Sequence, residues 1–447
     1  MITVPVTAVA GLVSIRLLVS GIGPAGYGSV VLITSLPALL PFADLGLGAW
    51  LVDNTTRSKS DVLAAFGRSF RLLLRNSVLF CVAAAAIGAA GIWHLMLGFP
   101  ANGQLERGAT IGMSLFALSV PLSLGYSLAL GAGRNHSAVY LRAIAPVANV
   151  VVLSLAVAAG CDPCWYVVIL MLTPLPGAVL ACRLAARALD LGTRDLIRAC
   201  RVPSGQPVAR SFAGGMLVIM LALPVTYQTD RIVISHVLGS DAVARYSAMA
   251  ALYGTALGLV NAAGLTLWPQ FARRRREGRS AFLDLRRMTF IFAAFTAPMA
   301  AALVFLAPWV TTVMTHGQAP AGRGLAAAFG LLLLVIGTHL PCGMFLTDAR
   351  GLGLQAWGCT LMALTSVVLS IALCGAMGPA GPVLASSIAF LACVWPVTAI
   401  GIRGAWVRET DQRAVGQSEC QVGGVGLPSA RRADANSFTG FRGGVGQ

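Results

Sequence analysis

The sequence has few charged residues, and those that it has are mostly of one sign and one kind. Charged residues make up 11% of the 447 positions, with 16 acidic and 32 basic residues, and Lys59 is the single lysine. A soluble domain carries roughly 25% charged residues. Hydrophobic residues reach 57%, and the mean hydropathy is +0.79. This balance excludes an ordinary soluble protein and indicates a chain that lies in lipid.

The residue patterns of common enzymes are also missing. There are no paired carboxylates on a predicted outer loop, no cluster of metal ligands and no glycine-rich phosphate loop with its lysine. A membrane glycan polymerase or ligase would carry a large outer loop with catalytic groups, and the longest candidate loops, near 99–108 and 315–323, are too short. We therefore expect a protein that is not an enzyme and that has no cofactor and no metal site.

Apolar stretches long enough to cross a bilayer recur along the whole chain. Hydrocarbon about 30 Å thick requires about 20 mainly apolar residues per helix. The first half contains such stretches at 3–22, 28–52, 77–98, 109–131, 142–160 and 165–183, and the second half at 211–238, 243–270, 288–314, 324–347, 356–376 and 380–402. The first stretch lacks the basic start of a signal peptide, so we interpret it as a retained helix. The sequence predicts an all-α integral membrane protein of about twelve helices.

A basic loop after the sixth stretch divides the predicted helices into two groups. We expect a six-helix lobe in residues 1–200 and a second in residues 201–406. Residues 407–447 are rich in Gly, Ser, Arg and Gln. Such a segment cannot bury enough apolar surface to offset its ordering entropy, so we predict a disordered cytoplasmic tail there.

The positions of the basic residues predict how the chain lies in the membrane. Twenty-seven of the 32 basic residues fall in alternate loops or in the tail. Lys and Arg in short loops stay on the cytoplasmic side of a membrane. We therefore expect a protein of the bacterial cell (inner) membrane with both termini in the cytoplasm. Basic loops beside anionic lipid headgroups account for the net charge of +16 without a nucleic-acid partner. The run "ARRRREGR" at 272–279 could in addition bind an anionic lipid headgroup.

Most of the ten cysteines lie in or beside apolar helices. Cys161 and Cys164, in "GCDPCW", instead fall in a loop on the predicted outer side. A disulfide between them is compatible with an oxidising compartment. Zinc would need more ligands than this loop supplies.

The two halves open with a similar pattern. Each has an arginine, a serine four residues later, a glycine three or four residues after the serine, and a tyrosine at the start of the next helix. The first three residues are Arg16, Ser20 and Gly23 in one half and Arg231, Ser235 and Gly239 in the other. Six helices followed by six with the same direction favour a parallel repeat about an axis along the membrane normal.

Two segments resemble a known family. "RLLVSGIGPAGYGSVVLITSLPALLPFADLGLGAWLV", followed by a basic loop, is similar to the opening of the polysaccharide transporters of the MOP superfamily, of the O-antigen flippase type. "YQTDRIVISHVLGSDAVARYSAMAALYG" at 227–254 resembles the seventh and eighth helices of that family. The resemblance implies two lobes around a central cavity lined by the first and seventh helices. It implies a membrane-lipid environment and a cargo of glycan on a polyprenyl pyrophosphate, which is moved from the inner to the outer leaflet.

The arginines of the repeat are the candidate cargo contacts. An arginine at the centre of a membrane helix costs at least about 2.5–3.5 kcal/mol on insertion scales, so it normally faces a wet cavity or a partner. A pyrophosphate is such a partner, because guanidinium binds phosphate bidentately. Arg16 lies seven residues before Gly23, roughly 10 Å inside the outer boundary at about 1.5 Å per residue. We expect Arg16, Ser20, Arg231 and Ser235 to bind the substrate, although the arginines could also extend to the interface.

Two acidic residues are candidates for coupling or gating. Asp230 precedes Arg231, so the two side chains project about 100° apart on a helix. Asp230 could pair with an arginine on a neighbouring helix, or it could titrate and couple transport to an ion gradient or to the membrane potential. Asp44 lies some 24 Å from Gly28 along the second helix, where it could cap the helix, hydrate a gate or carry a proton.

The sequence fits two other transporter classes less well. A multidrug or metabolite antiporter of the same superfamily would favour an acidic cavity for cationic drugs, whereas this sequence places arginine there. A major-facilitator transporter would carry a basic signature between its second and third helices, which "VDNTTRSKSDV" lacks. The lipid-linked oligosaccharide flippase is the favoured interpretation, with the antiporter as its alternative.

Overall fold

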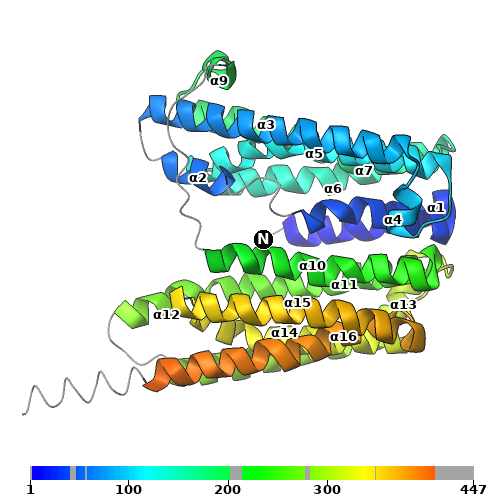
Figure 1. Ribbon diagram of the computed structural model, residues 1–447, viewed down its shortest axis with the longest axis vertical. Coiled ribbons are helices and arrows are strands. Elements are labelled where there is room, and N and C mark those ends of the chain that lie inside the picture. The colour runs from blue at the N-terminus through cyan, green and yellow to red at the C-terminus, as the bar shows by residue number, and fades with distance from the viewer. Residues whose placement is uncertain are drawn as a thin grey trace, which may run out of the picture. The chain divides into compact units, whose positions relative to one another are not determined.

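The computed structural model describes residues 3–40, 47–55, 58–201, 214–276, 282–347 and 349–407 (Figure 1). These residues are almost entirely helical and contain no β-strand. The first half comprises α1 (Thr3–Ser35), the 3-10 helix η1 (Leu36–Leu39), α2 (Leu47–Asn54), α3 (Lys59–Ala89), α4 (Trp93–Leu97), α5 (Gly103–Gly131), α6 (Asn135–Ala158), α7 (Pro163–Leu172), α8 (Pro174–Ala188) and α9 (Thr193–Arg201). The second half comprises α10 (Gly214–Leu238), α11 (Ser240–Leu265), α12 (Leu267–Arg276), α13 (Phe282–Met314), α14 (Arg323–Phe345), α15 (Ala349–Met377), α16 (Ala380–Ala389) and the π-helical turn η2 (Phe390–Val394).

The structure confirms an all-α chain built for a membrane. Among the described residues, ten helices are long and apolar enough to cross a bilayer. One of them, Pro5–Leu39, joins the first predicted helix to the start of the second, because the helical pattern runs on across a kink at Gly23. Residues 202–213, where the two predicted lobes would meet, lie outside the described residues. The twelve-helix arrangement in two lobes therefore stays a prediction.

The second predicted helix, 28–52, is not continuous. Regular α-helix ends at Ser35, and the 3-10 turn of η1 follows with Pro37 at its start. Proline lacks the backbone N–H that would continue the helical hydrogen bonds, which explains the break. Helical structure returns at Leu47 in α2. Residues 41–46 lie outside the described residues.

Several helices begin earlier than hydropathy alone indicates. α3 starts at Lys59, whereas the apolar stretch starts at 77. The side chain of Ser58 caps this helix by accepting a hydrogen bond from the Asp61 backbone N–H at 3.3 Å. The added turns bury Val62 and Phe66 in a core shared with α2, α5 and α8. A hydropathy search finds the lipid-facing part of such a helix and misses the amphipathic part that packs on protein.

Met1–Ile402 forms one compact unit, in which most helices pack on helices of their own half. In the first half α3 packs on α5, α5 on α8 and α1 on α6. In the second half α13 packs on α14, while α15 packs on α10 and α16. Arg403–Gln447 forms a second unit. Except for Val407, the predicted disordered tail at 407–447 lies outside the described residues.

The principal contact between the halves joins α1 and α11. A Cβ added to Gly28 would lie 2.0 Å from the carbonyl oxygen of Ser240, so only glycine fits at this crossing. The hydroxyl oxygens of Ser29 and Ser240 lie 3.2 Å apart and are buried there. Small residues at a crossing let two membrane helices approach closely, and α1 and α11 use this device.

The loops of the first half gather at two ends. At one end Lys59 pairs with Asp190 at 3.6 Å, and a Cβ on Gly131 would meet Thr55. At the other end α4 lies beside the start of α5, opposite the end of α3 where α9 packs (Figure 1). We call this second end the glycine end. Contacts described below bring Gly239 there, and the crossing of Gly28 with Ser240, the residue after Gly239, brings the Gly23 turn of α1 near it. The glycine end corresponds to the predicted outer side, an assignment that stays a prediction.

Candidate functional site

Gly23 and Gly239 have nearly the same backbone conformation. Gly23 has φ 73° and ψ 174°, and Gly239 has φ 80° and ψ 177°. This region of positive φ and extended ψ is accessible almost only to glycine. Each glycine therefore separates the helix that carries a predicted arginine from the helix that follows. The repeated sequence pattern thus corresponds to a repeated backbone turn.

Arg231 lies in the C-terminal half of α10, eight residues before Gly239, and is partly buried. Its guanidinium Nη1 donates a hydrogen bond to the side-chain oxygen of Gln228, and its Cζ lies 5.6 Å from the centre of the Tyr246 ring. Its Nε is buried without a hydrogen-bond partner among the described residues. The groups in direct contact with this cation are therefore an amide and an aromatic face. The cation forms no ion pair in the described part of the chain, and the buried carboxylate of Asp230, its neighbour in sequence, attracts it only at longer range.

Asp230 is 3% exposed and lies in a polar cluster between α10, α11 and α15. The Tyr246 hydroxyl donates to Asp230 Oδ2 at 3.2 Å, and the Ser370 hydroxyl donates to Oδ1 at 3.2 Å. Tyr246 thus contacts both predicted residues: its hydroxyl binds the carboxylate and its ring faces the guanidinium. Burial of a carboxylate requires such hydrogen bonds, because an unpartnered one would lose its hydration without compensation.

Arg16 and Ser20 occupy the matching positions of α1 in quite different surroundings. Both side chains are exposed, and the Ser20 hydroxyl donates to the Leu17 carbonyl of its own helix at 2.9 Å. Within the described residues, no hydrogen bond joins Arg16 or Ser20 to Arg231 or Ser235. The four predicted substrate contacts are therefore not gathered into one polar cluster in this conformation.

Ser235 has a contact that the sequence analysis did not anticipate. It is 3% exposed, and its hydroxyl lies within hydrogen-bond distance of the Leu97 carbonyl at the end of α4. The Ile232 carbonyl is a second acceptor at 3.0 Å. In this conformation Ser235 therefore holds α10 against α4.

The remaining predicted residues have simpler outcomes. Asp44 lies outside the described residues. Cys161 is partly buried, Cys164 is buried in the first turn of α7, and both thiols are free in the structure. A disulfide between them stays a prediction.

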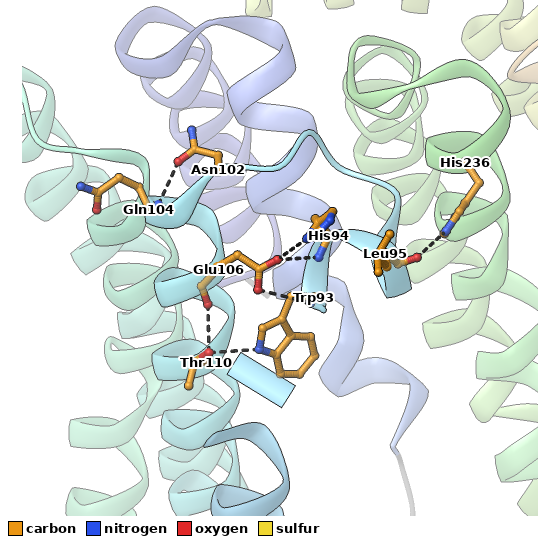
Figure 2. Close-up of polar contacts among 8 residues, drawn as sticks. All are labelled: Trp93, His94, Leu95, Asn102, Gln104, Glu106, Thr110 and His236. Atoms are coloured by element: carbon orange, nitrogen blue, oxygen red, sulfur yellow. Dashed lines mark hydrogen bonds and ion pairs between the residues drawn. The ribbon is translucent and has the colours of Figure 1, made fainter. Parts of the chain in front are cut away.

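A polar cluster around α4 was missed by the sequence analysis (Figure 2). Glu106 on α5 accepts hydrogen bonds from the backbone N–H groups of Trp93, at 3.2 Å, and His94, at 2.8 Å. The Nδ1 atom of His94 lies 2.7 Å from the same carboxylate. The Trp93 indole donates to Thr110 Oγ1 at 3.0 Å. These bonds fix α4 to the first half of the chain.

The other side of α4 faces α10. His236 Nε2 lies 3.0 Å from the Leu95 carbonyl, as Figure 2 shows. A Cβ on Gly98 would lie 2.8 Å from Ser235 Oγ and 2.9 Å from His236 Nδ1. These contacts bring the end of α10, and with it Gly239, to the end of the first half that carries α4. In the sequence, α4 corresponds to "WHLMLGF" at 93–99. Hydropathy alone assigns most of this segment to the end of the predicted membrane helix 77–98.

The fold matches solved structures of membrane transporters over nearly its whole length. "Lipid II flippase MurJ, inward closed conformation" gives a TM-score of 0.67 at 13% sequence identity, with 90% of this chain and 87% of that one covered. An inward-facing multidrug resistance MATE family transporter of the MOP superfamily gives 0.63 at 14% identity, covering 91% and 96%. An outward-facing structure described in the same terms gives 0.52 at 14% identity, covering 92% and 96%. The comparison with protein-family models and that with curated protein sequences give no match.

These likenesses define the fold class. The chain has the helical membrane fold that is found both in a multidrug transporter of the MOP superfamily and in a lipid II flippase. The TM-scores of 0.63 and 0.67 establish the shared fold, and sequence identities of 13–14% leave the cargo open.

Proposed function

We propose that this protein is a transporter that moves a polyprenyl-pyrophosphate-linked oligosaccharide from the inner to the outer leaflet of a bacterial cell membrane. It works by alternating access: the two lobes rock so that a central site opens to one side and then to the other. The shared fold with transporters supports the class of function. The likeness to a lipid II flippase is the fold-level support for a lipid-linked cargo.

The observation that carries the cargo proposal is the environment of Arg231. Its guanidinium contacts Gln228 and Tyr246, both uncharged, and its Nε has no partner among the described residues. A cationic side chain within the membrane is stabilised when it pairs with an anionic group, and a bound anionic cargo can supply that group. A pyrophosphate offers several oxygens to a guanidinium and forms short, charge-assisted bonds. Arg16, exposed on α1 at the matching depth, is the second proposed contact.

The contacts at the glycine end support a transport cycle with alternating access. There α1 meets α11 through Gly28 and Ser240, and α4 meets α10 through Ser235 and His236. Closure at this end agrees with the higher TM-score to the inward-facing structure, 0.63, than to the outward-facing one, 0.52. We propose that this conformation receives cargo from the inner leaflet and that these contacts break when the cargo leaves.

The direct test is made in a strain that lacks this protein. Polyprenyl-linked glycans are extracted after cells are treated with a sugar-oxidising label that cannot cross the membrane. The proposal expects completed lipid-linked units to accumulate in a form that the label does not reach, and a plasmid copy of the wild-type chain to restore labelling. Normal labelling of completed units in the deletion strain would reject the lipid-linked cargo.

A second candidate function, a drug or metabolite antiporter, is favoured by Asp230. A buried carboxylate held by the Tyr246 and Ser370 hydroxyls is a suitable group to carry a coupling proton. Dye efflux from cells that express wild-type protein or Asp230→Asn separates the candidates. Efflux that Asp230→Asn abolishes, combined with normal glycan labelling in the deletion strain, would establish the antiporter.

A further inference from the structure

His236 stands at the contact between α10 and α4 with both ring nitrogens facing carbonyl oxygens. Nδ1 lies 2.8 Å from the Ile232 carbonyl, and Nε2 lies 3.0 Å from the Leu95 carbonyl. A backbone carbonyl accepts hydrogen bonds and cannot donate one. Both distances are hydrogen-bonding distances, so each nitrogen needs its own proton to form a bond.

Neutral imidazole carries a proton on one nitrogen only, whereas imidazolium carries a proton on both. In the neutral ring, one of the two nitrogens would direct a lone pair at a carbonyl oxygen. In the imidazolium, both nitrogens donate, and each bond is charge-assisted. We propose that His236 is a proton-binding site and that the bound proton fastens α4 to α10.

The position of α4 explains why this contact controls the glycine end. Glu106 and Thr110 tie the start of α4 to the first half of the chain through Trp93 and His94. His236 and Ser235 tie its other side to α10 in the second half. The helix is thus a bridge between halves, which we call the α4 latch (Trp93–Gly98 with Ser235 and His236). If the proposed transport cycle opens the glycine end, the α4 latch must come apart.

The latch is built for close contact. Gly98 has φ 73° and ends α4 in the left-handed region. A side chain there would meet both Ser235 and His236 at under 3.0 Å. Glycine therefore satisfies both the backbone turn and the approach of α10.

Other titratable or charged groups lie on the helices that pack on α10. They are His94 on α4, Arg16 and Tyr27 on α1, Asp241, Arg245, Tyr246 and Tyr253 on α11, and Arg350, Cys359 and Cys374 on α15, and α10 itself adds Tyr227, Asp230 and Arg231. Among the described residues, none of them forms an ion pair with His236. Histidine ordinarily changes charge between about pH 5 and 8. His94, which faces Glu106, and Asp230, the buried carboxylate named above as a possible proton carrier, are therefore the competing sites that the test must separate.

The sign of the effect follows from linkage. A proton that binds the closed latch more tightly than the open one shifts the equilibrium toward the closed latch. The latch should therefore be closed in acid and should open as the pH rises. This inference deepens the proposed transport function by naming what regulates closure, but the closure can be measured without any cargo.

Hydrogen exchange of the full-length protein in lipid nanodiscs tests the proposal. The exchange of a peptide covering 92–103 is compared between wild type and His236→Gln at pH 5.5 and pH 8, always at equal pH so that intrinsic exchange cancels. Glutamine keeps one neutral donor. We expect the wild-type latch to exchange roughly tenfold more slowly than the variant at pH 5.5, the lower range for a hydrogen bond to a charged group, and nearly equally at pH 8.

Four matched variants make the outcome specific. His136→Gln, an exposed histidine at the start of α6, should behave as wild type. Ser235→Ala should speed exchange by the same factor at both pH values, because a hydroxyl does not titrate there. His94→Gln and Asp230→Asn should each keep the pH dependence. A wild-type to His236→Gln ratio that is the same at both pH values, or a pH dependence that disappears in His94→Gln or Asp230→Asn instead, would overturn the proposal. Neither result would affect the glycan-labelling test of the proposed cargo.

Discussion

The part of α1 before Gly23 and the end of α10 show how one sequence pattern acquires two environments. Both carry an arginine, a serine four residues later and a glycine with positive φ. In α1, Arg16 and Ser20 are exposed. In α10, Arg231 contacts Gln228 and Tyr246, and Ser235 is buried against α4. The comparison teaches that the pattern determines the backbone turn, whereas the neighbouring helices determine what each polar side chain can bind.

The largest expected difference concerns the two arginines in transport. Arg231→Ala should slow glycan flipping about 10- to 100-fold, because it removes a partly buried charge that would form charge-assisted bonds with cargo. Arg16→Ala should slow it less than about fivefold, because an exposed charge contributes about 1 kcal/mol or less. Labelling of lipid-linked glycan in complemented deletion cells measures both. Arg245→Ala, an exposed arginine on α11, is the control. Equal losses at positions 16 and 231 would contradict the asymmetry.

The next effect concerns the crossing of α1 and α11. Gly28→Val should lower the stability of the protein in detergent by about 1–3 kcal/mol, since its Cβ would overlap the Ser240 carbonyl. Gly11→Val, on the same helix with open space around it, controls for helix propensity. Thermal unfolding followed by circular dichroism measures the difference. If the two variants melt alike, the close crossing is not part of the stable fold.

The two glycine turns should respond alike. Gly23→Ala and Gly239→Ala each force a side chain into a backbone region of positive φ and extended ψ, at a cost of roughly 1–3 kcal/mol. The same unfolding measurement applies, with Gly103→Ala in the first turn of α5 as a control in open space. A cost at only one of the turns would show that the repeat is not conformationally equivalent.

The smallest effect separates the two serines. Ser235→Ala should destabilise the protein by about 1 kcal/mol, because it removes the hydrogen bond to the Leu97 carbonyl. Ser20→Ala should change stability by less than about 0.5 kcal/mol, because this exposed hydroxyl binds only its own helix. Thermal unfolding of the two variants in parallel measures both losses of stability. A larger loss for Ser20→Ala than for Ser235→Ala would contradict the prediction.

The fold was largely predictable, and the polar contacts were not. The predicted helix 324–347 corresponds closely to α14 at Arg323–Phe345, whereas α5, α6, α13 and α15 begin six or seven residues before their predicted starts. The errors fall where hydropathy is a poor guide, at the amphipathic start of α3 and at the Pro37 break. The predicted helix 77–98 joins the end of α3 to the short α4, because the residues of α4 are as apolar as those of a membrane helix. In the structure α4 is a separate helix that ends at Gly98.

The sequence by itself determined the membrane class, the approximate helices and the two glycine turns. These depend on local properties: apolar length, the missing donor of proline and the conformational freedom of glycine. Only the tertiary structure decided that Asp230 binds Tyr246 and Ser370, and that His236 meets α4. The partners lie 16, 140 and 141 residues apart in sequence, so helix packing alone brings their polar groups within bonding distance.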